Sequence, residues 1–157
     1  YGNVWGYETM DENSRHFSAF TVQDCRRLQV LQNKVLRLKT GLNFETPTLT
    51  LLKTANDMSV HQLIAYKTIL TVHKTMQTKK PSYIYNKLKP KQNGRPLRND
   101  ANLDIQAELT ITRGGFMYRA SKLYNMIPNH IKNEQKYNTF KTKIKTWIKQ
   151  NISVRPK

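Results

Sequence analysis

The sequence predicts a mainly α-helical fold: a compact helical domain of about five to six helices, with a basic loop and room for one small β-hairpin. Three observations predict this class. Apolar residues recur at spacings of three and four in several segments, helix-capping residues precede those segments, and Gly and Pro gather between them. With 157 residues and 38% hydrophobic content, the chain is long enough to bury a sizeable core.

The first predicted helix begins after Thr21 and ends at Gly41. Thr21 followed by Asp24 resembles a capping box, with Asp in place of the usual Glu or Gln. An apolar stripe follows at helical spacing and consists of Val22, Cys25, Leu28, Leu31, Val35 and Leu38. We expect this stripe to pack against the rest of the domain and the opposite face to be cationic.

Two further helices are predicted before residue 79. Thr46 and Pro47 are typical of an N-cap and a first helical position, and they predict a short helix to Ala55. Ser59 can cap a helix that runs to about Thr78 and is apolar around most of its circumference. A helix of that kind is usually central, so we expect it to form the middle of the core.

The second half of the chain is predicted to begin with a loop. Lysines and arginines mixed with Pro and Gly over residues 79–99 predict an exposed basic loop around one short helix near 83–88. Weak alternation before Gly114 allows the small hairpin over 103–112. Helices are expected again over 116–126, before Pro128, and over about 138–150.

These elements divide the chain into three regions of one compact domain. Residues 1–78 form a helical region, residues 79–113 the basic loop or linker, and residues 114–157 a basic helical region at the C-terminal end.

Net charge is the feature that most limits the range of possible functions. The chain has 27 Lys and Arg against 10 Asp and Glu, a net charge of +17. Residues 1–78 contain 9 basic and 6 acidic side chains, whereas residues 79–157 contain 18 and 4. Such an excess attracts polyanions, and nucleic acid is therefore the expected partner.

Phosphate contacts are expected from three places: the cationic face of the first helix, the basic loop, and the helices that follow it. In the last helix, Lys141, Lys145 and Lys149 repeat at intervals of four, where like charges repel one another unless an anion binds. The candidate nucleic-acid-binding residues are Arg26, Arg27, Lys34, Arg37, Lys79, Lys80, Lys87, Lys89, Lys91, Arg95, Arg98, Arg113, Arg119, Lys122, Lys141, Lys145 and Lys149.

No catalytic residue, metal ligand or cofactor is expected in this chain. Its acidic residues are too scattered to hold the two Mg²⁺ ions of a polymerase or nuclease, and its four histidines lack metal-ligand spacing. Cys25 is the only cysteine, so an intramolecular disulfide and a Cys-based zinc site are excluded. We expect Cys25 and Trp147 to be packed in the core rather than to act as a nucleophile and a base-stacking group.

A reducing, intracellular location in the cytoplasm or nucleus fits the lack of disulfides. No stretch approaches the roughly 18 to 20 apolar residues of a membrane span, so no membrane partner is expected.

Several short motifs occur in a fixed order along the chain. They are the run YGNVWG at residues 1–6, LQVLQNKVLRL at 28–38, YRASKLYNMIP at 118–128, and FKTKIK at 140–145 followed by Trp147. This order resembles the region downstream of the palm in reverse transcriptases of non-LTR (LINE) retrotransposons of the jockey and CR1 type. The chain departs from that family at Ala120, where the family has Gly, and at Tyr124, where it has Trp.

The resemblance implies a thumb-like helical module that holds the template and primer duplex through phosphates. It also implies that the polymerase palm, with its catalytic aspartates and Mg²⁺, lies upstream of Tyr1, so that this chain is a fragment and not an enzyme by itself. RNA or an RNA–DNA hybrid, together with the remainder of the reverse transcriptase, would then be its partners.

Two other functions remain open. One is a domesticated, transposon-derived protein-interaction or structural module, whose association would survive salt and depend on apolar groups such as Tyr66, Leu70 or Trp147. The other is a small standalone nuclease, which would need an acidic metal cluster. The sequence leaves the oligomeric state and the preference for RNA or DNA open.

Overall fold

The computed structural model of the chain describes residues 22–88, 102–103 and 116–155. Within them the helices are α1 (Val22–Thr40), α2 (Thr48–Ala55), α3 (Val60–Thr78), α4 (Ser82–Tyr85), α6 (Phe116–Met126), α7 (Asn129–Lys132) and α8 (Tyr137–Asn151). The mainly α-helical class is therefore confirmed. Residues 104–112 of the expected hairpin, and Thr21 of the expected capping box, lie outside the described residues.

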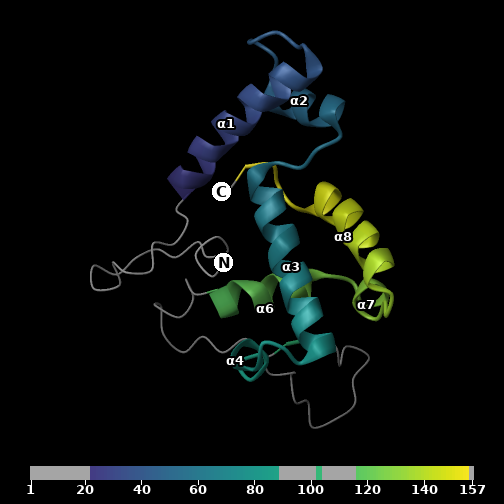
Figure 1. Cartoon of the computed structure of the whole chain (residues 1–157). Helices are drawn as coiled ribbons and strands as arrows, with labels where there is room; N and C mark the ends of the chain where they lie inside the picture. Colours follow the sequence, from purple (N-terminus) through teal and green to yellow (C-terminus); the bar gives the residue numbers. More distant parts are fainter. Residues whose placement is uncertain (1–21, 89–101, 104–115, 156–157) are drawn as a thin grey trace, which may run out of the picture.

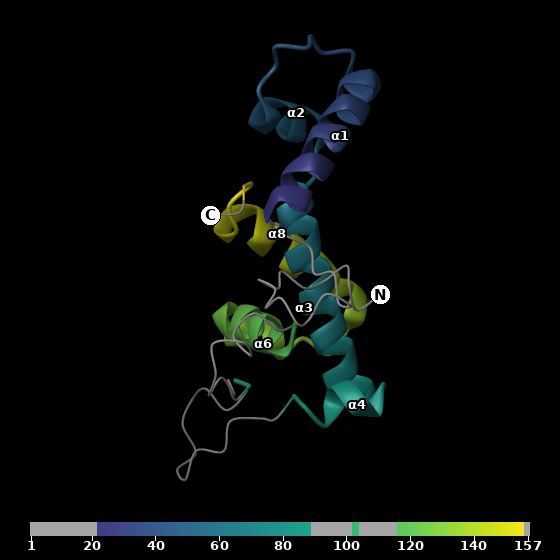
Figure 2. The same cartoon turned by 90° about the vertical axis from the view of Figure 1, so that its left-hand side faces the viewer.

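Helix α3 runs through the middle of the molecule (Figures 1 and 2). Helices α1 and α2 lie at the end where α3 begins, and α4 lies at the end where α3 stops. Helix α8 packs beside α3, α6 packs across it, and the short α7 packs against α8.

The predicted central position of residues 60–78 is confirmed, because Ile69 and Val72 of α3 are fully buried. They belong to the main core, which also includes Phe140, Ile144 and Ile148 of α8. The predicted cap at Ser59 is also present. The backbone N–H of Gln62 donates to Ser59 Oγ, and the backbone N–H of Ser59 donates to the side-chain Oε1 of Gln62, both at 3.2 Å. This reciprocal pair satisfies backbone donors that the start of a helix leaves without partners.

Helix α2 begins one residue later than predicted. Pro47 occupies the N-cap with an extended backbone, and no side chain accepts a hydrogen bond there. Thr48, the first helical residue, instead uses its hydroxyl to accept from Asn33 Nδ2 at 2.8 Å. The expected N-cap role of Thr46 was therefore wrong.

The predicted packing face of α1 was also wrong. Of its apolar stripe only Cys25 is buried, whereas Leu31, Val35 and Leu38 are 55%, 61% and 86% exposed. The buried side of α1 carries Cys25, Asn33 and Leu36. Leu36 packs with Leu51 and Leu52 of α2 in a second, smaller core.

Hydrogen bonds explain why α1 packs through its amide side. Gln29 Oε1 accepts from the Val60 N–H at 2.9 Å and so serves the first turn of α3. Gln32 Nε2 donates to the Met58 carbonyl at 2.8 Å, and Asn33 Oδ1 accepts from Gln29 Nε2 at 3.0 Å. Burying these amides costs little free energy because each has a hydrogen-bond partner. The fold therefore buries the amide side of α1, and the apolar stripe remains on the surface.

One histidine is part of the main core. His73 of α3 is buried, and its ring stacks on Phe140 with the centroids 3.6 Å apart and the planes 7° from parallel. Burial lowers the pKa of the His73 imidazole below its ordinary value of 6.5, because desolvation disfavours the charged ring; the Glu134 backbone opposes this in part. The neutral ring is therefore the form that the fold favours.

This environment predicts a loss of stability in mild acid. A pKa that is lower in the folded state means that the unfolded chain binds the proton first, so the free energy of unfolding falls as the pH drops through about 6.5. Urea unfolding at pH 7 and pH 5 should show this fall in the native protein and a smaller fall in His73→Phe, which keeps a flat ring but cannot titrate. Equal falls in the two proteins would assign the effect to other groups.

Candidate nucleic-acid interface

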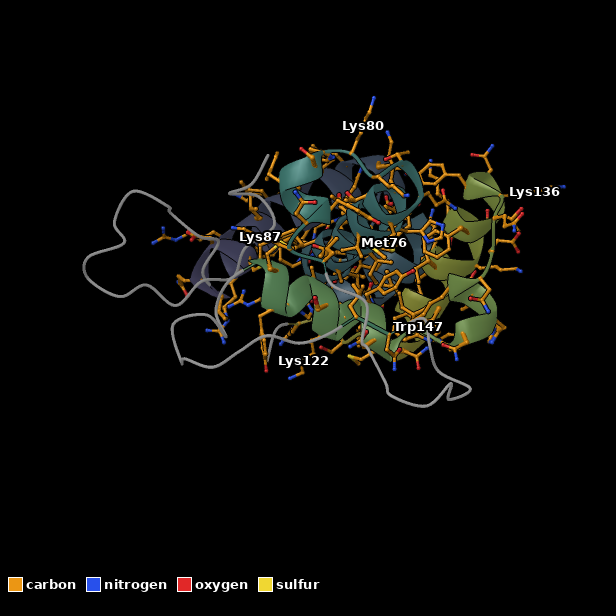
Figure 3. All side chains as sticks on the ribbon, turned by 90° about the horizontal axis from the view of Figure 1, so that it is seen from below. Met76, Lys80, Lys87, Lys122, Lys136 and Trp147 are labelled. Carbon is orange, nitrogen blue, oxygen red and sulfur yellow. The ribbon has the colours of Figure 1, made fainter. Side chains whose placement is uncertain are left out.

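Exposed lysines are distributed around the end of the molecule where α3 stops. Lys79 is the left-handed C-cap of α3, Lys80 precedes α4, and Lys87 follows α4. Lys122 of α6 and Lys136, the N-cap of α8, are exposed as well. Figure 3 looks at this end of the molecule and shows Lys80, Lys87, Lys122 and Lys136 projecting at separate points around it. We call these five residues the basic end.

In the described part of the chain, few acidic side chains lie near these lysines. Among the described residues, Asp24, Glu45 and Asp57 lie in or beside α1 and α2, at the opposite end of α3. Glu134 is the one acid that the structure describes after residue 57, and its Oε2 lies 2.6 Å from Lys143 Nζ. That hydrogen bond lowers the pKa of Glu134, with a smaller contribution from nearby Lys136. The other four lysines of the basic end retain a strong positive field.

Leu88 and Leu103, which flank the basic segment after α4, both belong to the main core. Leu88 and Leu103 are each only 2% exposed and belong to that core. The Asn125 side chain of α6 binds both backbone groups of Leu103: the Leu103 N–H donates to Oδ1, and Nδ2 donates to the Leu103 carbonyl, each at 2.8 Å. The described residues on either side of 89–101 are therefore both anchored in the main core.

That intervening segment carries several of the predicted binding residues. Lys89, Lys91, Arg95 and Arg98, like Arg113 farther on, lie outside the described residues.

Lys132 helps to hold the returning chain. It is buried, and its ammonium donates to Asn102 Oδ1 at 2.6 Å and to the Asn125 carbonyl at 3.4 Å. It also lies 5.4 Å from the centre of the Tyr124 ring, close enough for a cation–π interaction. Burial lowers the pKa of this ammonium group. Lys132 therefore has a structural role within the fold.

Removing the Asn125 side chain should destabilise the fold. In Asn125→Ala the N–H and C=O groups of Leu103 lose their partners, and we expect the free energy of unfolding to fall by about 2 kcal/mol, at roughly 1 kcal/mol for each bond. Urea unfolding measures the loss. Asn151→Ala removes an exposed amide that bonds only within α8, and it should cost less than about 0.5 kcal/mol. Similar losses in the two variants would contradict this role of Asn125.

The cationic face of α1 does not join the basic end. Arg26, Arg27 and Lys34 are exposed, but α1 lies at the other end of α3 (Figures 1 and 2). Arg37 is half-buried: its Nη2 donates to the Thr46 carbonyl at 3.3 Å, and its guanidinium lies 5.0 Å from the centre of the Phe44 ring. The structure thus separates the predicted residues into two groups and gives Arg37 a local packing role.

The expected row of lysines along α8 is not a row of three free charges. Lys149 Nζ donates to the carbonyl and to Oδ1 of Asn56, at 3.1 and 2.8 Å, and so joins α8 to the left-handed C-cap of α2. Lys141 is half-buried and lies over the Tyr137 ring, whereas Lys145 is exposed. Arg119 of α6 is half-buried.

Sequence reasoning did not single out Lys132 or Lys136. Lys136 stands one residue before α8 and outside any run of basic residues, so its spacing gave no signal. Lys132 gave no signal, because its partner Asn102 is thirty residues away in the sequence.

The structure gives no sign of a metal site or a membrane span in its described parts. Within residues 22–88, 102–103 and 116–155, no group of three or more His, Cys, Asp or Glu side chains could hold a metal ion. Nor does any helix described there have the length and apolar character needed to cross a membrane. No protein-family model, curated protein or solved structure matches the chain.

Proposed function

We propose that this chain is a non-catalytic, nucleic-acid-binding helical module that holds the phosphate backbone of RNA or of an RNA–DNA hybrid. The observation that carries the proposal is the basic end, where exposed lysines next to α3 and α4, in α6 and before α8 surround one end of the molecule. Residues 89–101, which follow the basic end residue Lys87 in the sequence, are also rich in lysine and arginine. Lysines so arranged recognise phosphates as point charges and carry no sequence code.

Binding through phosphates suits a protein that moves along its substrate. The contacts are independent of base sequence, so the nucleic acid can slide while the protein remains bound. Tyr83 of α4, which is 69% exposed and lies in the chain between Lys80 and Lys87, offers a ring on which an unpaired base could stack. In this proposal lysines provide the affinity and Tyr83 favours single-stranded regions.

We further propose that the module derives from the region downstream of the palm in a non-LTR retrotransposon reverse transcriptase. The motifs at residues 28–38, 118–128 and 140–147 support this origin. In that setting the lysines would hold the template and primer duplex, and the catalytic aspartates and Mg²⁺ would belong to the palm.

Binding across a salt series tests the proposal. The purified chain is titrated with a labelled RNA hairpin, an RNA–DNA hybrid and duplex DNA of equal length. Binding should weaken steeply with salt, with a log–log slope of about −0.7 to −0.9 for each phosphate neutralised. Weak binding that salt does not change would contradict it.

The alternative function, a protein-interaction module, would need apolar groups on the surface. Leu70, which we expected to serve it, is buried in the main core and is not available to a partner. The exposed apolar stripe of α1 is available, and it lies at the other end of α3 from the basic end.

A further inference from the structure

The exposed stripe of α1 has the spacing of a coiled-coil seam. Leu28, Leu31, Val35 and Leu38 follow one another at intervals of three, four and three. In a heptad labelled a to g they occupy a, d, a and d, the positions that meet a partner helix. All four side chains are exposed, from 36% at Leu28 to 86% at Leu38. We call these four residues the seam.

Contacts within the protein leave the seam uncovered among the described residues. Helix α1 meets α2, α3 and the residues between them through Gln29, Gln32, Asn33 and Leu36, none of which belongs to the seam. A row of four aliphatic side chains on a surface helix is unusual unless it is an interaction site.

The charges beside the seam decide what can cover it. The g positions hold Arg27 and Lys34, and the later e position holds Lys39. Arg27 and Lys34 are exposed, and Lys39 has only a long contact with Asp57, at 3.8 Å. In a parallel pair of identical helices Lys34 would face Lys39, and in an antiparallel pair the two g positions would face each other. Both arrangements bring like charges together and disfavour a second copy.

We propose that α1 is a docking helix for an amphipathic helix of another protein, with aliphatic residues at its own a and d positions and acidic residues at its e and g positions. The seam provides the apolar contact, and Arg27, Lys34 and Lys39 select the acidic flanks. This function goes beyond nucleic-acid binding and uses the opposite end of the molecule.

The test uses synthetic helical peptides as probes of the full chain. The acidic peptide has Ile and Leu at a and d and Glu at e and g, and a basic peptide has Lys at e and g instead. A third peptide keeps every Glu but has Ser at a and d, so it reports simple attraction to the positive charge of the chain. Fluorescence anisotropy should give a dissociation constant for the acidic peptide at least about tenfold lower than for either of the others.

Variants of α1 then locate the contact. Leu31→Ser should weaken binding of the acidic peptide about tenfold or more. Val30→Ser is the matched control, because Val30 is on the same helix, is also 55% exposed and lies outside the seam. Exchanging both Arg27 and Lys34 for Glu should reverse the preference towards the basic peptide. Circular dichroism verifies that each variant remains folded.

Three results would overturn the proposal. The first is equal binding of the acidic peptide and its Ser-substituted form. The second is a dimer of the chain alone in sedimentation that Leu31→Ser dissociates, because it would make a second copy the occupant. The third is that the native chain binds none of the peptides, while Leu31→Ser loses RNA binding. Weak RNA binding by the native chain would contradict the proposed role of the basic end but would not bear on docking at the seam.

Discussion

Replacing Lys80, Lys87 and Lys122 together by Gln is expected to weaken binding to an RNA hairpin by roughly tenfold to hundredfold near 0.1 M salt. Each exposed lysine that neutralises a phosphate releases a counterion, so the loss of three contacts should also make the log–log salt slope shallower by about 2 to 3. Titrations of the native chain and the variant at several salt concentrations give both quantities.

A matched variant separates this local effect from a general loss of charge. Lys39, Lys53 and Lys67 are exposed in α1, α2 and α3 and lie outside the basic end. Their replacement by Gln removes the same net charge, and it should change RNA affinity by less than about threefold. If the two triple variants lose affinity equally, the positive charge acts as a whole and the basic end is not a site.

Phe140→Ala is expected to be the most destabilising single substitution in α8, with a loss of about 3 to 5 kcal/mol in the free energy of unfolding. Phe140 is fully buried and stacks on His73, so its removal leaves a cavity between α3 and α8. Because the free energy of unfolding of a domain is only about 5 to 15 kcal/mol, this substitution would remove a large part of it.

Urea unfolding of Phe140→Ala beside Tyr137→Ala measures that loss. Tyr137 lies on the same helix, is partly exposed and lies beneath the Lys141 ammonium group. Its truncation should cost less than about 1 kcal/mol. A small loss in Phe140→Ala would contradict the central place of this ring in the core.

Local signals predicted several elements because the residues that cause them are close in sequence. Ser59 caps α3 and α6 ends at Met126, before Pro128, as expected, whereas the part of Gln62 in the capping box was not predicted. The last helix, α8, was predicted to within one residue at each end. Capping and apolar periodicity act over three or four residues, so they can be seen in a single sequence.

The packing side of α1 could not be predicted in the same way. Periodicity indicated the aliphatic stripe, but Gln29 and Gln32 find their partners at Val60 and Met58, far along the chain. Hydrogen bonds between distant residues have no signature in spacing, and they decided which side is buried. The aliphatic stripe is nevertheless informative, since it is the surface to which we assign a partner.

The candidate site was predicted in composition but not in geometry. The charge excess after residue 78 indicated the region that contains Lys79, Lys80, Lys87 and Lys122, all of which are exposed. The sequence could not show that Lys149 binds Asn56, or that Arg37 is used in packing near Phe44. Those contacts depend on how α8 and α1 lie against α2.

Lysine footprinting is the most direct test of the claim that the basic end holds the nucleic acid. The chain is acetylated briefly, with and without a saturating RNA hairpin, and the modification of each lysine is measured by mass spectrometry. We expect RNA to protect Lys80, Lys87 and Lys122 by several-fold and to leave Lys53, at the other end of the molecule, unchanged. Equal protection of all four lysines, or stronger protection of Lys53, would contradict the account.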